Sequence, residues 1–250
     1  MNANDSPVAV GPGDRVNGDR PAGDRDAGRG PGRGAVEGYL RATRTGPRAQ
    51  ARSVRRMEPT AQAQMGPLGL VGFIVVTTIA TGLDAGVFPE SVAAEVVPVG
   101  FFIGGLAQLL AGLFQAHRGD TWHATVFGGF GLFWCAKAVL LQWVLPGLDP
   151  SVRGTASGVF TFPWVFVVFV LWVASFRIHL ALLSTFSCVL VVFVAMTVYG
   201  FTGVMVWNRI AGWSGLAAAA GALYLLAGQV LASTWGRPVL PMGRFRFSVS

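Results

Sequence analysis

Charged side chains are scarce in this sequence, and this scarcity excludes an ordinary soluble domain. Asp, Glu, Lys and Arg make up 12% of the residues, whereas hydrophobic types make up 52%. Soluble globular proteins carry roughly a quarter of their residues as charges. The composition therefore predicts a protein that crosses a membrane several times.

Cysteine and histidine are also rare, which excludes several kinds of site. Cys135 and Cys188 both fall inside apolar runs, and the three histidines are scattered along the chain. This pattern predicts neither a disulfide framework nor a zinc site. The sequence has no nucleophile beside a base and no phosphate-binding loop, so we expect no enzyme, no metal and no cofactor. It predicts no cleavable signal peptide either.

The first 62 residues are the exception to the low charge. Eleven arginines and seven acids are interspersed there with glycine and proline, without a long apolar run. Such a segment cannot bury enough apolar surface to offset the entropy lost on ordering, so residues 1–62 are expected to form a disordered cytoplasmic tail. The interleaved acids disfavour nucleic-acid binding by this tail.

Six apolar runs are long enough to span a bilayer, which needs about 20 residues per helix. Polar and turn residues separate these runs. The expected spans are residues 67–87, 96–116, 122–145, 157–176, 180–206 and 211–232. The sequence therefore predicts an all-α membrane protein, with a six-helix transmembrane domain over residues 63–243 and a short cytoplasmic C-terminus at 244–250.

The arginines outside the tail indicate how the spans are oriented. With a cytoplasmic N-terminus, five of them fall in inside segments and two, Arg153 and Arg209, fall in outside loops. Basic residues concentrate on the cytoplasmic side of membrane proteins. We therefore expect a multi-pass protein of the cell membrane with both termini in the cytoplasm.

The 34 glycines are numerous for a helical protein, because a glycine inside a helix costs up to about 1 kcal/mol relative to alanine. Small residues four positions apart, such as Gly100 and Gly104, lie on one helix face and let backbones approach closely in lipid. We expect them to pack helices or subunits together. The main candidates for helix packing are Gly69, Gly104, Gly105, Gly112 and Gly131.

Polar side chains inside the spans need a partner or water. An unsatisfied amide in hydrocarbon costs several kcal/mol, so Gln108 and Gln229 either hydrogen-bond a neighbouring helix or line a permeation path. Lys137 either extends toward the outer surface or attracts anions in a vestibule. Thr77 can hydrogen-bond its own helix and is less informative.

Three sequence blocks, in order, carry a resemblance to a known family. They are GPLGLVGF at 66–73, FFIGGLAQLLAGLFQAHRGDTWHATVFGGFGLFW at 101–134, and AGWSGLAAAAGALYLLAGQVL at 211–231 with GRPVLPMG at 236–243. Over about residues 64–243, the sequence resembles the acetate uptake transporter family, the succinate-acetate permeases of bacteria and fungi.

The resemblance implies six transmembrane helices around a pore, with the subunits assembled as a homohexamer in the lipid bilayer. It implies passage of acetate and related short monocarboxylates, and of succinate in some members, by proton symport or in a channel-like way. It places the narrow point of the pore at Phe73, Phe130 and Val189. The polar candidates along the pore are Gln64, Thr77, Gln108, Gln115, Lys137 and Gln229.

Several positions depart from the family pattern. Glutamates of the second and last helices of the family read Gln115 and Gln229 here, and a Ser-Tyr-Gly of the third helix reads Gly-Phe-Gly at 129–131. These changes remove titratable and hydroxyl groups, so proton coupling through side chains is disfavoured. An apolar constriction favours the neutral acid, because a carboxylate ion is costly to desolvate. Passage of the anion escorted by amides and Lys137 also fits.

An alternative function from another class remains open. The chain could be a structural or regulatory membrane protein that keeps this fold without transporting anything. Its arginine-rich tail would then bind anionic lipid or a protein partner.

Overall fold

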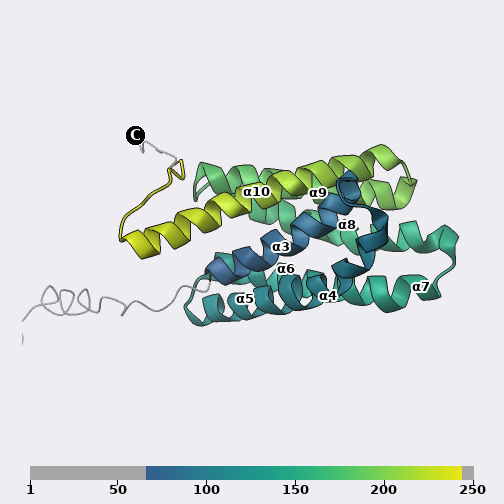
Figure 1. The fold of residues 1–250 in the computed structure, drawn as a ribbon, viewed down its shortest axis with the longest axis horizontal. Helices are drawn as coiled ribbons and strands as arrows, with labels where there is room; N and C mark the ends of the chain where they lie inside the picture. Colours follow the sequence, from purple (N-terminus) through teal and green to yellow (C-terminus); the bar gives the residue numbers. More distant parts are fainter. Residues whose placement is uncertain (1–65, 244–250) are drawn as a thin grey trace, which may run out of the picture. The chain divides into compact units, whose positions relative to one another are not determined.

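The structure is a computed structural model that describes residues 66–243, and every regular element within this range is a helix (Figure 1). Six helical segments in this range are long and apolar enough to cross a membrane, which confirms the fold class predicted from the sequence. The predictions for the tail at 1–62, for Gln64 and for the C-terminus at 244–250 lie outside the described residues.

Four of the six spans are single helices, and the other two are composite. The single helices are α3 (Gly66–Ala85), α8 (Pro150–Ser175), α9 (Leu180–Thr202) and α10 (Met205–Trp235). The second span consists of η1 (Glu90–Glu95), α4 (Val96–Pro98), η2 (Val99–Ala107) and α5 (Gln108–His117). The third span consists of α6 (Thr121–Val139), η3 (Leu140–Val144) and α7 (Leu145–Gly147).

Helix α3 is the central element of the bundle. It packs against α10 on one side and against η2 and α5 on the other, as Figure 1 shows. Helix α9 packs between α8 and α10, and α5 packs along α6. Segments far apart in the sequence, near residues 73, 130 and 189, are brought together by this arrangement.

The expected start of the fourth span, near residue 157, is wrong because a local cap begins α8 at Pro150. The Asp149 side chain accepts a hydrogen bond from the backbone N–H of Ser151 at 2.8 Å. Proline at the first helical position is compatible with such a start, because its missing N–H has no partner within the helix anyway. The segment expected to be a loop therefore forms the first two turns of α8.

The expected break between the last two spans, at residues 207–210, is also wrong. The chain turns at Gly203, which has a left-handed backbone with φ of +67°, and α10 begins at Met205. A glycine adopts this conformation without strain and commonly ends helices. Asn208 and Arg209 are thus in the first turns of α10 rather than in a loop.

The contact between α5 and α6 depends on glycine. A Cβ added at Gly112 would lie 2.7 Å from the Cα of Gly128, and one added at Gly131 would lie 2.9 Å from the Cα of Leu109. Backbone atoms cannot move aside as a flexible side chain can, so these positions admit no larger residue without separating the helices. The other expected packing glycines also face a neighbouring helix: Gly69 faces Phe127, Gly104 faces Val76 and Gly105 faces Cys135.

Candidate permeation pathway

Three cavities follow one another along α10. The first has a volume of about 430 Å³ and is lined from α10 by Asn208 and Ala218. The second, of about 220 Å³, is lined by Ala222 and Gln229, and the third, of about 420 Å³, by Gln229 and Ser233. Neighbouring cavities share lining residues, so they are adjacent in space.

The boundary between the first and second cavities is formed by Phe73, Phe130 and Val189, which line both. These side chains come from α3, α6 and α9. The rings of Phe73 and Phe130 have their centroids 6.0 Å apart, and Phe130 and Val189 are each only 4% exposed. The boundary is therefore narrow, apolar and closed by side chains rather than by backbone.

Further aromatic rings hold this boundary in place. Phe130 packs against Phe193 at 6.0 Å and stacks with Trp164 at 6.5 Å between centroids. Phe133 packs against Phe193 at 5.1 Å. Aromatic pairs of this kind add about 0.5–1.5 kcal/mol each beyond the burial of their area, which limits the motion of Phe130.

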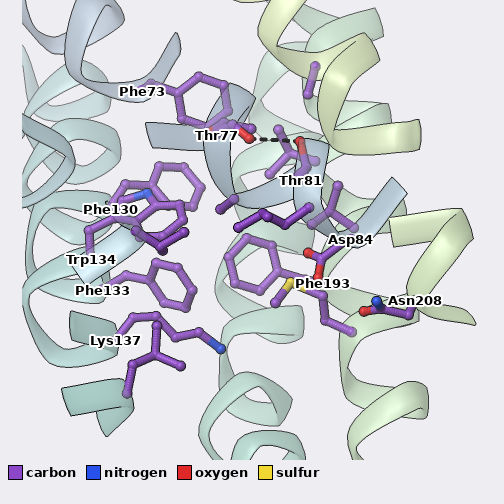
Figure 2. A pocket seen from close by; sticks show the side chains of 18 of the residues that line it. Phe73, Thr77, Thr81, Asp84, Phe130, Phe133, Trp134, Lys137, Phe193 and Asn208 are labelled. Atoms are coloured by element: carbon purple, nitrogen blue, oxygen red, sulfur yellow. Dashed lines mark hydrogen bonds between the residues drawn. The ribbon is translucent and has the colours of Figure 1, made fainter. Parts of the chain in front are cut away.

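The first cavity combines these rings with polar and charged side chains (Figure 2). Thr77, Thr81 and Asp84 line it from α3, and Lys137 lines it from α6. The Thr81 hydroxyl donates to the Thr77 carbonyl oxygen at 2.7 Å. The Thr77 hydroxyl is buried and has no hydrogen-bond partner in the described part of the chain.

The second cavity contains an unusual buried amide. Gln108 at the start of α5 is 0% exposed, and neither its Oε1 nor its Nε2 has a partner among the described residues. A buried amide without hydrogen bonds costs roughly 1–3 kcal/mol by protein mutational data. Because Gln108 lines the second cavity, a polar molecule in that cavity would satisfy the amide.

Gln229 lines both the second and the third cavity, whereas Gln115 lines none of the three. Both amides nevertheless flank the start of α3. A Cβ added at Gly66 would lie 3.2 Å from Gln229 Oε1 and 3.4 Å from Gln115 Nε2. The two positions where the family pattern has glutamate are thus close together in space.

His179, a residue not singled out from the sequence, lines both the second and the third cavity. Its Nδ1 accepts a hydrogen bond from the backbone N–H of Leu182 at 3.1 Å, so it caps α9. Burial lowers the pKa of the His179 imidazole below its ordinary value, and the nearby His123 lowers it further. Both effects favour the neutral form of the imidazole.

Helix periodicity relates Asp84 and Lys137 of the first cavity to the two boundary rings. Phe73, Thr77 and Asp84 recur on one face of α3, at steps of four and seven residues. Lys137 follows Phe130 by seven residues on α6 in the same way. The helix faces that carry Phe73 on α3 and Phe130 on α6 therefore also carry Asp84 and Lys137, which line the same cavity as the two rings.

No cluster of three or more His, Cys, Asp or Glu side chains suited to a metal ion occurs in residues 66–243. The chemistry available along the cavities is instead that of amides, hydroxyls, imidazoles, aromatic rings, two carboxylates and one ammonium group. Such groups can bind and guide a small polar molecule.

Several proteins with similar sequences, and one with a similar structure, are named as transporters or channels. The chain is 32% identical to the succinate-acetate/proton symporter SatP of Escherichia coli over 188 residues, which is 75% of this chain and 98% of the relative. It is 35% identical to acetate permease A of Emericella nidulans over 79 residues, 32% of this chain and 26% of that relative.

The structure of the bacterial acetate channel SatP is similar as well. It matches with a TM-score of 0.67 and 30% sequence identity, over 73% of this chain and 99% of that chain. A sequence profile of the GPR1/FUN34/yaaH family matches residues 48–242, which is most of the chain. These matches confirm the resemblance drawn from the three sequence blocks, and this multi-pass membrane protein belongs to the GPR1/FUN34/yaaH family.

Proposed function

We propose that this protein is a transporter, not an enzyme, and that it moves acetate and related short monocarboxylates across the cell membrane through the three cavities. The observation that carries the proposal is the boundary at Phe73, Phe130 and Val189, which lines two cavities at once. The names of the relatives, a succinate-acetate/proton symporter and an acetate channel, support this class of substrate.

The first cavity opens toward the outside of the cell, and both termini are cytoplasmic. Two features support this orientation. The end of the bundle near the first cavity carries three acids, Asp84, Glu90 and Glu95, and two arginines, Arg153 and Arg209. The opposite end carries three arginines, Arg118, Arg177 and Arg237. Arginine in short loops favours the cytoplasmic side of a membrane.

The acid crosses the boundary in its neutral form. The boundary consists of two phenyl rings and a valine side chain, which offer no hydrogen bonds to a carboxylate ion. Removing the hydration shell of a carboxylate costs far more than removing that of the neutral acid. A carboxylate and a proton therefore enter the first cavity from the aqueous side, and the protonated acid passes the rings.

Beyond the boundary, the amide of Gln108 receives the carboxyl group. Its free Nε2 can donate to the carbonyl oxygen of the acid, and its free Oε1 can accept from the acid O–H. The small volume of the second cavity, about 220 Å³, favours short acids. Gln229 and His179 continue the path toward the third cavity.

The protein assembles as a homohexamer in the bilayer. Helix α8 is available for such a contact, because large apolar side chains such as Phe166 and Val170 are 60% and 65% exposed in the single subunit. In a membrane such a face is covered either by lipid or by a neighbouring subunit.

Counterflow of radiolabelled acetate into vesicles that contain the purified protein tests the proposal. We expect uptake well above that of vesicles without protein. If the protein is instead a transport-inactive structural or regulatory scaffold, counterflow will be no faster than in the empty vesicles, and the proposed function will be wrong.

A further inference from the structure

Two oppositely charged side chains reach into the first cavity from opposite walls. Asp84 extends from the last turn of α3, and Lys137 extends from α6 (Figure 2). In the part of the chain that the structure describes, the two do not form an ion pair with each other. The space between them belongs to the cavity.

Asp84 is held by groups of α10. The Asn208 side chain lies beside its carboxylate. The Arg209 guanidinium donates to the backbone carbonyl oxygen of Asp84 at 3.2 Å. These contacts fix the position of the negative charge at one wall of the cavity.

The Lys137 ammonium group has no hydrogen-bond partner among residues 66–243, so its donors are free to bind a ligand. Its Nζ lies over the Phe160 ring, 5.9 Å from the ring centroid, and it forms no ion pair within the described residues. An ammonium group has three N–H donors and no acceptor, so it favours a carboxylate oxygen as its partner. A small acid whose carboxylate binds Lys137 would place its apolar end near Phe133 and Phe193, which line the same cavity.

A second carboxylate on the same ligand would meet a different environment. Lys137 is the only cation among the residues that line this cavity, whereas both Asp84 and Glu90 are acidic. One carboxylate can be neutralised by Lys137, but another would approach negative charge without a compensating partner. Like charges a few ångströms apart repel strongly where screening by water is incomplete.

We propose that Asp84 and Lys137 make the first cavity a filter for ligands with a single carboxylate: Lys137 binds one carboxylate, and Asp84 repels a second. This inference rests on the proposed function, and it narrows the substrates to monocarboxylates. Dicarboxylates such as succinate are excluded by charge rather than by length.

Uptake of labelled acetate, butyrate and succinate into vesicles at neutral pH tests the filter. Succinate and butyrate have the same number of carbons, so their difference reports the second carboxylate. Asp84→Asn should raise succinate uptake relative to butyrate by about tenfold, because one repulsive charge a few ångströms away is removed. Lys137→Met should lower acetate and butyrate uptake by about tenfold, since the binding cation is lost.

The matched control is Glu95→Gln, which removes an acidic residue of η1 that does not line the cavity, and it should leave all three rates unchanged. Glu90→Gln is a second test in case Asp84→Asn is not monodisperse on size-exclusion chromatography, and it should raise the succinate-to-butyrate ratio less strongly. An unchanged ratio in both lining variants would overturn the filter.

A binding measurement separates this inference from the proposed function. Acetate should raise the unfolding temperature of the detergent-purified wild type more than succinate does, and Asp84→Asn should reduce that difference. If the wild type transports neither acid but shows this binding pattern, the proposed function fails, and only the preference of the first cavity for a single carboxylate remains. If it transports acetate and Asp84→Asn changes neither uptake nor binding, only the filter fails.

Discussion

The first and second cavities are on the two sides of one apolar boundary, yet they differ in charge. The first is lined by Asp84, Glu90 and Lys137. The second is lined by the amides of Gln108 and Gln229, by two imidazoles and by apolar side chains, without a carboxylate, lysine or arginine among its lining residues. The two cavities therefore suit different steps. The first can discriminate ligands by their charge, and the second can bind an uncharged carboxyl group.

Closing the boundary should have the largest effect, because it disconnects the two cavities. Val189→Phe adds a ring where Phe73 and Phe130 already meet, so acetate uptake should fall to the level of empty vesicles. Val191→Phe is the matched control, since Val191 is on the same helix but is 43% exposed on its outer face. If Val189→Phe takes up acetate as fast as the wild type, the permeation path does not pass this boundary.

Removing the free amide of the second cavity should affect transport and stability in opposite directions. Gln108→Leu deletes a carboxyl-binding group, so acetate uptake should fall by about tenfold. The same change removes a buried amide without partners, so the protein should unfold at an equal or higher temperature. Gln115→Leu, on the same helix but outside the cavities, should reduce uptake less. A loss of stability in Gln108→Leu with normal uptake would make Gln108 a structural residue.

Adding a carboxylate to the second cavity should remove its difference in charge from the first cavity. Gln229→Glu restores the glutamate of the family pattern at a position that lines the second and third cavities. We expect acetate uptake to become several-fold slower at alkaline pH than at acidic pH, because an ionised carboxylate there repels any acid that loses its proton. Uptake by this variant that follows the wild-type pH profile would contradict an uncharged second cavity.

The smallest expected effect concerns His179 and acts on stability. Because burial lowers the pKa of His179 in the folded protein, its neutral form is favoured by folding. The stability it contributes is fully present above the ordinary histidine pKa and declines as the pH falls through that value toward the lower folded-state pKa. His179→Asn keeps a side chain that can cap α9 but removes the titratable imidazole. We therefore expect the stability of this variant to fall slightly less on acidification than that of the wild type. The measurement is the unfolding temperature in detergent at a series of pH values. The same pH dependence in the variant and the wild type would contradict this role of His179.

The sequence predicted the six spans because long apolar runs are a strong signal. It did not predict the start of α8 at Pro150 or the turn at Gly203, because single capping and turn residues decide these ends against the apolar pattern. The error at Gly203 had a consequence for the site. Asn208 and Arg209 were predicted to be in a loop, so their contacts with Asp84 were not expected.

The three boundary residues were expected from the family resemblance, and no local pattern in the sequence identifies them. Their meeting depends on how α3, α6 and α9 pack, which a single sequence does not specify. For Gln108, the sequence allowed two roles: a hydrogen bond to a neighbouring helix, or a place on the wall of a permeation path. The structure provides no partner for its side chain within the described residues, which favours the permeation path.

Acetate uptake measured while pH and membrane potential are varied independently tests the central claim, that the acid crosses an uncharged boundary as a neutral molecule. The account predicts that uptake rises as the entry side is acidified and does not change with membrane potential at constant pH. Uptake that follows the membrane potential at constant pH would show that the anion itself crosses Phe73, Phe130 and Val189, and would contradict the account.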